Sequence, residues 1–364
     1  MAGAPVFTDA VGAVHPRGAW YMAGWDDDLA PGALHAISIL GEPLVLFRAD
    51  SGIAAFEDRC PHRAAPLSLG RCEGVTLRCM YHGVRFAADG TCVEIPGQDT
   101  LPPQLKVRTF PALERHSALW VWMGDPALAD EAAIPPFVGH RDPAWALGIG
   151  RVDYAAPARL IHDNLLDLTH ISYVHAESFA GGSQASADGW LGARVDTRSH
   201  ERGVSVERCM GGMPPNPAGG GGGATESSDV WSRYDFLIPG VFIQTTERYR
   251  PGTMDPAAPA RCPEANQFST FTCQAVTPLT ADTTSYFWAF GPQAAHAERK
   301  DFFVALGAKA FAEDKRMIEA QWRTMRATDT KVMPLAMDKA LFKYDAALKR
   351  FLGEADTSRE SEAA

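Results

Sequence analysis

Cys60-Pro61-His62 and Cys79-Met80-Tyr81-His82 are the two segments that decide the fold of the N-terminal part of this chain. The first follows the pattern Cys-x-His and the second Cys-x-x-His, with sixteen residues between them. A zinc finger instead groups two cysteines and then two histidines. Thiolates suit iron–sulfur clusters or zinc, and imidazole suits either metal. The mixed pairs therefore predict one metal centre held by four side chains.

The number of these ligands favours a two-iron cluster. A [2Fe–2S] cluster needs two protein ligands for each iron, so Cys60 and Cys79 can bind one iron while His62 and His82 bind the other. This is the Rieske pattern, in which two imidazoles replace two thiolates and raise the reduction potential. A structural zinc, or four unrelated residues in loops, are the alternatives at this point.

The sequence around both segments is typical of a small antiparallel β domain. Short apolar runs are separated by turn residues, which predicts strands at 36–40, 43–48 and 53–56. The last strong strand is expected at 118–123. We predict an all-β domain over 1–125 and a proline-containing connector over 126–150. Gly70 and Gly83 are expected to let the ligand loops turn tightly.

The second half mixes helices and strands, so the chain as a whole is predicted to be α+β. One helix is expected within 157–176 and a second, with an amphipathic pattern, over about 299–326. Strand-like runs lie at 203–209, 230–247, 267–276 and 283–291. The interval 210–228 is rich in glycine and proline and is expected to be a mobile loop. These elements predict a second domain over 151–352 and a frayed tail over 353–364.

A second group of metal-binding residue types begins at Asn164. Asn164, Asp167 and His170 are three residues apart in turn, and they share one face if the segment is helical. His170 and His175 lie about 140° apart around an ideal helix. Both can bind one metal only if the helix ends or distorts between them. Two histidines and one carboxylate would form a facial triad with open positions for oxygen, and a structural or polar-surface role is the alternative.

The carboxylate must come from elsewhere, and the late helix offers Asp314. The apolar stripe of that helix consists of Phe303, Leu306, Ala310, Phe311, Ile318, Trp322 and Met325. Asp314 lies inside the stripe, whereas Asp301, Glu313 and Glu319 lie towards its edges or off it. A buried carboxylate is costly unless it is paired or bound to a metal. Asp314 is therefore the predicted third ligand, with an internal salt bridge as the alternative.

The composition limits the class of protein. The formal net charge is −10, which argues against a nucleic-acid partner. The sequence contains no uninterrupted run of about 18 apolar residues, so we expect no transmembrane helix. Residues 1–20 lack the pattern of a secretory signal. Seven cysteines are a poor disulfide framework. We expect a cytoplasmic protein with reduced thiols, in which Cys72 and Cys92 have no ligand role.

Both constellations, in this order, resemble the Rieske non-haem iron aromatic-ring oxygenases, and more closely their O- and N-demethylase branch, which includes vanillate and dicamba demethylases. The resemblance covers nearly the whole chain. It rests on residues 58–63, 79–83, 119–124, 164–175 and 313–315. Many relatives carry tryptophan where this chain has Val84, and Met80 follows Cys79. These two differences favour the demethylase branch over a cis-dihydroxylating dioxygenase.

The resemblance implies an N-terminal Rieske domain and a C-terminal helix-grip domain, in which an antiparallel sheet wraps a helix and an apolar pocket. It implies that a mononuclear Fe(II) is bound by His170, His175 and Asp314. Asn164 would lie near this iron. Asp167 would have a catalytic role, bridging His170 to His82 of a neighbouring subunit in a homotrimer.

The implied activity is that of the oxygenase component of a multicomponent monooxygenase. It would use O2 and electrons from a separate NAD(P)H-linked reductase or ferredoxin to hydroxylate, or to O- or N-dealkylate, an aromatic compound. A cis-dihydroxylating ring dioxygenase and a Rieske electron carrier without catalytic iron are the alternatives. The substrate is not indicated. Residues expected to line its pocket, or else to belong to the core, are Ile161, Leu165, Ile171, Phe242, Trp288 and the glycine-rich loop.

Overall fold

The computed structural model describes residues 5–181, 183–215, 226–254, 261–262, 267–329 and 331–353. They form two compact units. One comprises Pro5–Pro136 together with Thr277–Thr284, and the other comprises Phe137–Val276 and the described residues from Ser285 onwards. No described helix is both long enough and apolar enough to cross a membrane.

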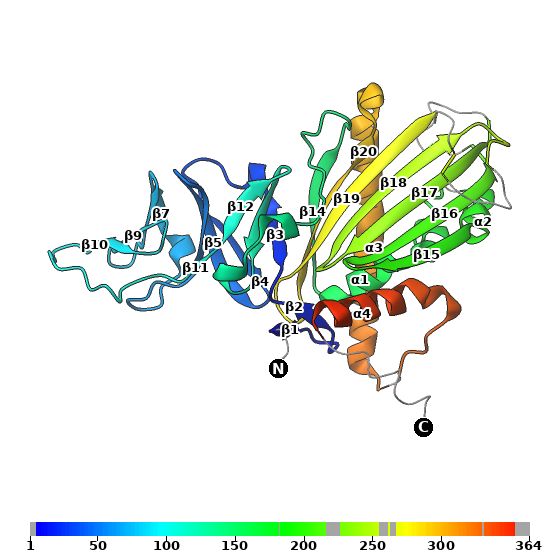
Figure 1. Cartoon of the computed structure of the whole chain (residues 1–364). Helices are drawn as coiled ribbons and strands as arrows, with labels where there is room; N and C mark the ends of the chain where they lie inside the picture. Colours follow the sequence, from blue (N-terminus) through cyan, green and yellow to red (C-terminus); the bar gives the residue numbers. More distant parts are fainter. Residues whose placement is uncertain are drawn as a thin grey trace. The chain divides into compact units, whose positions relative to one another are not determined.

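The first unit is built from short strands, most of them in antiparallel sheets (Figure 1). The strands are β1 (Val6–Thr8), β2 (Val14–Pro16), β3 (Trp20–Trp25), β4 (His35–Ile39), β5 (Glu42–Ala49), β6 (Gly52–Glu57), β7 (Arg71–Glu73), β8 (Thr76–Arg78), β9 (Arg85–Ala87), β10 (Cys92–Glu94), β11 (Thr109–Phe110), β12 (Ala112–Arg115) and β13 (Ala118–Trp122). The larger sheets have the orders β11-β6-β5-β4, β12-β13-β3 and β10-β9-β8-β7. The strands predicted at 36–40, 43–48, 53–56 and 118–123 are confirmed by β4, β5, β6 and β13.

The second unit is a seven-stranded sheet with helices packed against it. The strands are β14 (Gly148–Tyr154), β15 (Arg194–His200), β16 (Gly203–Met213), β17 (Ser228–Leu237), β18 (Val241–Tyr249), β19 (Phe268–Pro278) and β20 (Thr284–Pro292). The order is β14-β20-β19-β18-β17-β16-β15, and β15 to β19 pair antiparallel. The helices are α1 (Ala158–Leu166), α2 (Gln184–Leu191), α3 (Lys300–Ala327) and α4 (Lys339–Phe351). The predicted α+β class is confirmed.

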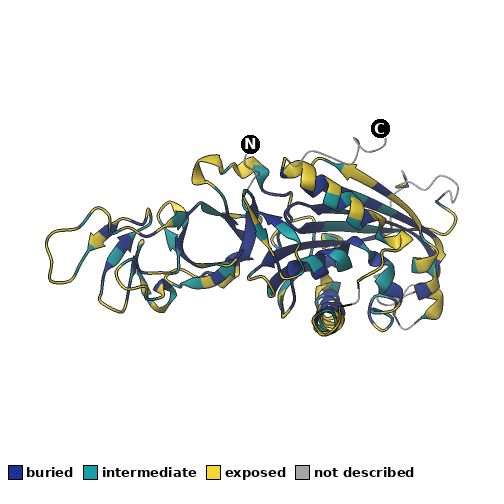
Figure 2. Cartoon of the chain, turned by 90° about the horizontal axis from the view of Figure 1, so that it is seen from below, coloured by how far each residue is buried: buried dark blue, intermediate teal, exposed yellow. Residues whose placement is uncertain are grey.

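Helix α3 runs along the large sheet in Figure 1, and it confirms the amphipathic helix expected over 299–326. Its buried side chains include most of the predicted apolar stripe, and Asp314 is buried among them with 4% of its surface exposed. Figure 2 shows the strands of this sheet largely in the colour of buried residues. The sheet and α3 therefore enclose the core of the second unit.

The helix expected within 157–176 is confirmed, and it fills only the first part of that interval. Helix α1 ends at Leu166, and a 3-10 helix follows at Leu168–Ser172. Asp167 between them has an extended backbone, with φ −124° and ψ 101°. Its carboxylate accepts hydrogen bonds from the backbone N–H and the hydroxyl of Thr169. A capping side chain of this kind ends one helix and starts the next.

The mobile loop predicted over 210–228 is wrong at its start. Strand β16 continues to Met213, and its register shifts between Met210 and Met213. Gly212 has a φ of 62° at this irregularity, a conformation that glycine adopts without strain. The glycine run itself, within residues 216–225, lies outside the described residues.

Candidate metal centres and substrate cavity

Cys60 and Cys79 occupy equivalent positions in two similar loops. The N–H of Cys60 donates to the carbonyl of Ala65, and its carbonyl accepts from the N–H of Ala64. Cys79 makes the same two bonds with the residues five and four positions further on, Val84 and Gly83. The fourth residue has a positive φ in both loops, 57° at Ala64 and 75° at Gly83. The two cysteines therefore lie at the start of two turns that share one hydrogen-bond pattern and one backbone conformation.

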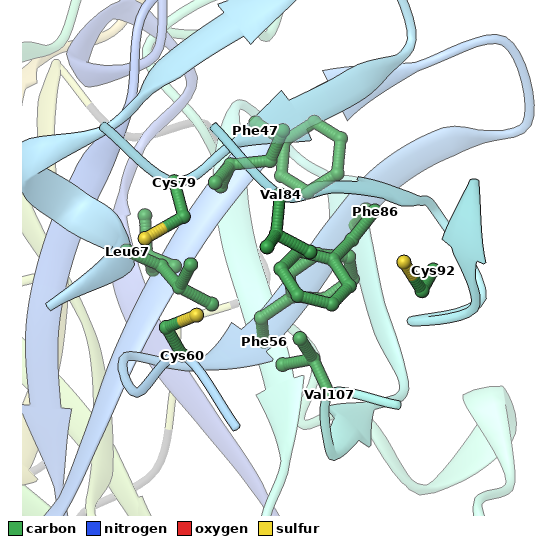
Figure 3. Close-up of a cluster of buried hydrophobic side chains, with 12 residues drawn as sticks. Phe47, Phe56, Cys60, Leu67, Cys79, Val84, Phe86, Cys92 and Val107 are labelled. Atoms are coloured by element: carbon green, nitrogen blue, oxygen red, sulfur yellow. The ribbon is translucent and has the colours of Figure 1, made fainter. Parts of the chain in front are cut away.

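The four predicted cluster ligands divide by burial. Cys60 and Cys79 are each 2% exposed, within the apolar cluster drawn in Figure 3. His62 and His82 are exposed, and their ring centroids are 4.7 Å apart. Neither cysteine forms a disulfide. Two buried sulfur donors and two exposed nitrogen donors fit a [2Fe–2S] cluster in which one iron takes the thiolates and the other the imidazoles.

Burial raises the pKa of the Cys60 thiol, and the adjacent Cys79 adds to the rise. Metal binding must therefore displace thiol protons. Cys92 lies apart from this pair in Figure 3, and its sulfur donates to the carbonyl of Glu94. Cys72 donates to the carbonyl of Gly74. Both contacts fit cysteines without a ligand role.

Arg78 holds the base of the second ligand loop. It donates to the carbonyl of Gly83 at 2.7 Å and forms a bidentate pair with Glu94. Gly83 is required by its positive φ and because a Cβ there would lie 2.7 Å from Pro96. Gly70 has a negative φ, but a Cβ there would lie 2.3 Å from the carbonyl oxygen of Arg78. The two glycines therefore permit close approach at both loops.

The second constellation converges on one point. The candidate ligand atoms of His170, His175 and Asp314 all lie within 4.8 Å of one another. His175 Nε2 is 3.2 Å and His170 Nε2 3.6 Å from Asp314 Oδ1. His170 lies on the 3-10 helix and His175 on the turn after it. The break after α1 is thus what allows both imidazoles to face the same carboxylate on α3.

Both imidazoles are oriented through their other nitrogen. His170 Nδ1 lies 2.6 Å from the backbone carbonyl of Asp167, and His175 Nδ1 lies 2.9 Å from Glu313 Oε2. The hydroxyl of Ser178 donates to the same Glu313 oxygen at 2.6 Å. Since a carbonyl and a carboxylate only accept, each Nδ1 carries a proton, and each Nε2 is the nitrogen left to bind a metal beside Asp314.

The electrostatics differ between the two histidines. Burial lowers the pKa of His170. Burial also opposes charging of His175, but hydrogen bonds and charge from Asp314 and Glu313 outweigh it, so its pKa is raised. Asn164 completes the group, because its Nδ2 donates to Asp314 Oδ1 at 3.1 Å and lies 3.5 Å from His170 Nε2. Two imidazoles and one carboxylate are the donor set of a non-haem Fe(II) facial triad.

The structure brings Asn164 and His170 together although the helical face expected to join them with Asp167 does not exist. Within this chain the His170 ring bonds to the backbone carbonyl of Asp167 and not to its carboxylate. The carboxylate accepts from Thr169 instead, and Arg208 Nη2 lies 4.0 Å from it.

Glu313 has a partner in the site that the sequence did not indicate. The sequence places it towards the edge of the apolar stripe, next to Asp314. The two neighbours point in different directions around α3, so Asp314 faces the Nε2 atoms while Glu313 reaches Nδ1 of His175 from outside. The spacing alone contained no signal for the partner of Glu313, because His175 is far from it in sequence.

A cavity opens beside the three converging side chains. Its apolar lining consists of Leu165, Leu168, Ile171, Phe179, Trp190, Phe242, Phe268, Phe290, Phe303 and Phe311. The predicted contributors Leu165, Ile171 and Phe242 are therefore confirmed. Ile161 and Trp288 do not line it. Trp288 instead packs against Phe311, with ring centroids 5.2 Å apart.

Comparison with known proteins matches both halves of the chain. Residues 19–111 match the Rieske [2Fe-2S] domain, and residues 154–353 match the vanillate O-demethylase oxygenase C-terminal domain. This chain belongs to the vanillate O-demethylase family of Rieske oxygenases. Its members carry the [2Fe–2S] cluster and the mononuclear non-haem iron that the two donor sets fit, and this oxygenase acts as the oxygenase component of a multicomponent monooxygenase.

Individual relatives match this oxygenase over most of its length. It is 35% identical to a toluene-4-sulfonate monooxygenase iron-sulfur subunit of Comamonas testosteroni, covering 92% of this chain and 96% of the relative. It is 36% identical to the vanillate O-demethylase oxygenase subunit of a Pseudomonas species, covering 79% and 87%. A crystal structure of dicamba monooxygenase bound to 3,6-dichlorosalicylic acid superposes with a TM-score of 0.81 at 28% identity, covering 93% and 97%.

Proposed function

We propose that this oxygenase hydroxylates a C–H bond of an aromatic compound, and that it releases the alkyl group as an aldehyde when that carbon is bonded to oxygen or nitrogen. The observation that carries the proposal is the aromatic-lined cavity that ends at His170, His175 and Asp314. Iron bound by these residues supplies O2 activation, and the Rieske cluster supplies electrons from a separate reductase or ferredoxin.

The proposed dealkylation balances as follows. An aryl methyl ether, O2, two electrons and two protons give a phenol, formaldehyde and water. The side chains around the cavity position the substrate and exclude water. The carbonyl of Asp167 and the carboxylate of Glu313 keep the imidazoles in the ligand tautomer, and Asn164 holds Asp314.

The test is turnover with a surrogate reductase and NADH on a panel of aryl methyl ethers, N-alkyl anilides and aromatic acids. We expect formaldehyde, or a longer aldehyde from a larger alkyl group, in step with substrate loss. A cis-dihydrodiol as the product would favour the dioxygenase alternative. If the cluster were reduced without turnover and the protein lacked the mononuclear iron, the electron-carrier alternative would be favoured.

Glu313→Gln should weaken iron binding about 10- to 100-fold, the usual effect of losing an outer partner of a ligand histidine. The neutral amide is a poorer acceptor for His175 Nδ1. The measurement is competition with a chelator, with the Rieske absorbance as an internal control. Glu177→Gln is the matched control, because it removes an exposed carboxylate near the same turn. Equal iron affinity in both variants would contradict the role of Glu313.

The family resemblance supports a homotrimer in which each cluster, held within residues 1–125, serves the iron site of the next subunit, held within residues 151–352. Residues 126–150 would join the two domains. Asp167 would bridge His170, through its backbone carbonyl, to His82 of the neighbouring subunit, through its carboxylate, which retains lone pairs for such a donor. We place the enzyme in the cytoplasm, with its supply of NAD(P)H.

Co-expression tests this assembly. Cys79→Ser chains should lack a cluster, and His175→Ala chains should lack a working iron site, so each alone should be inactive. Mixed trimers place an intact cluster beside an intact iron site, so activity should return in part. Sequential purification on two different tags isolates the mixture. A verified mixture that stays inactive would refute electron transfer between subunits.

A further inference from the structure

One wall of the cavity is a polar ladder on two paired strands. Alternate residues of β18 and β19 point to the same face of a sheet. The four cavity-lining pairs in register are Phe242 with Gln274, Gln244 with Thr272, Thr246 with Thr270, and Arg248 with Phe268. The ladder thus runs from Gln274 at one end to Arg248 at the other, and its polar side chains face a cavity whose other lining residues are largely aromatic or aliphatic.

Arg248 is a cation of this ladder whose register partners, within the described part of the chain, include no acid. Its Nη1 donates to the hydroxyl of Ser228 at 2.8 Å, and no carboxylate among the described residues pairs with it. Burial lowers the pKa of Arg248 to about 10, with no nearby charge acting against the change, and the group stays protonated at neutral pH. By contrast Arg159, another partly buried arginine of this unit, is bonded to both oxygens of Asp345.

Burying part of a guanidinium that has no carboxylate partner destabilises the fold, because no opposite charge offsets the free energy of its desolvation. The ladder carries a second buried polar group whose hydrogen-bonding capacity is not fully used. Gln274 is 4% exposed, and its Oε1 has no hydrogen-bond partner among the residues that the structure describes. Its Nε2 donates to Thr272. Both groups indicate that the cavity is built for a ligand with polar substituents.

The register separates Arg248 from the iron-binding segment. The hydroxyl of Tyr234 donates to the carbonyl of Leu166, just before that segment, and Tyr234 pairs with Gln244. Arg248 lies four residues further along β18, about 13 Å at the usual rise of a strand. Trp190 of α2 also lines the cavity. The cavity therefore extends from the facial triad along the ladder to the arginine.

We propose that Arg248 binds an anionic substituent, a carboxylate or a sulfonate, of the aromatic substrate and so fixes which carbon faces the iron site. The guanidinium fork matches either oxyanion. The hydroxyls of Thr246 and Thr270 lie on the next step of the ladder and can donate further hydrogen bonds. The inference rests on the proposed function, since it takes the cavity to be the substrate site, and it adds the substrate class.

Binding tests the inference without turnover. Calorimetry on the cluster-loaded protein would compare 4-methoxybenzoate with 4-methoxybenzamide, and toluene-4-sulfonate with toluene-4-sulfonamide. We expect at least one acid to bind about 10- to 100-fold more tightly than its amide, as for hydrogen bonds to a charged group. The better pair identifies the anion. Failure of turnover with this preference intact would contradict the reaction but not the anion site.

Arg248→Met should remove the preference for the acid and leave amide binding unchanged, whereas Arg248→Lys should retain part of it. Arg233→Met is the matched control, because Arg233 lies exposed on the same sheet outside the cavity. The Rieske absorbance and thermal unfolding show whether each variant is folded. The assignment is overturned if no acid binds more tightly than its amide, or if folded Arg248→Met keeps the acid preference of Arg233→Met.

Discussion

Asp314→Ala is expected to abolish turnover while the Rieske spectrum stays unchanged. Asp314 is the carboxylate of the converging set, and its Oδ1 lies 3.2 Å from His175 Nε2. Alanine leaves two imidazoles, so iron affinity should fall by more than about 100-fold, beyond the usual effect of an outer partner. The cluster ligands come from other segments, so the cluster should remain loaded.

The measurement is iron content, Rieske absorbance and single-turnover product in the same preparation. Asp301→Ala, an exposed carboxylate in the first turn of α3, is the matched control and should behave as the wild type. If Asp314→Ala kept its mononuclear iron and full activity, the third ligand would have to be another residue. Glu313 would be the first to examine.

Cys79→Ser and Cys60→Ser should each abolish the Rieske EPR signal and, with it, reductase-driven turnover. Each change removes one of the two thiolates assigned to the same iron, and the hydroxyl of serine is a much harder ligand than a thiolate. Both side chains are only 2% exposed, so no other thiol can reach the site without rearrangement. Mononuclear iron should still bind, because its three donors lie elsewhere.

Cys92→Ser is the matched control for these two variants. Cys92 is buried in the same apolar cluster but bonds to the carbonyl of Glu94. Its replacement should leave the EPR signal intact. A Rieske signal that survived in Cys60→Ser or Cys79→Ser would remove the ligand assignment, as would its loss in Cys92→Ser alone.

The sequence was most informative where function imposes a local pattern. The Cys-x-His and Cys-x-x-His segments need only short-range spacing, and the strands around them follow turn residues. Asp314 could be found because a carboxylate inside an apolar stripe must have a partner. That argument predicted burial on α3, but it did not specify which atoms Asp314 would face.

The errors arose where one side chain overrides a longer pattern or where contacts are distant in sequence. Asp167 caps the 3-10 helix after α1, so the α-helix ends before His170 and not between His170 and His175, where the sequence indicated a break. Glu313 and His175 meet only through the tertiary fold. Arg248 is an ordinary residue of a strand in the sequence, and only the register places it on the cavity face, where no described carboxylate pairs with it.

The most direct test of the whole account is the iron and acid-labile sulfide content of the anaerobically purified chain, measured together with its EPR spectrum. The account predicts about three iron atoms and about two sulfide ions per chain, with a Rieske-type signal on reduction. His170→Ala should lose about one iron atom and no sulfide. Two iron atoms in the intact chain, unchanged in His170→Ala, would contradict a mononuclear iron site and leave only an electron carrier.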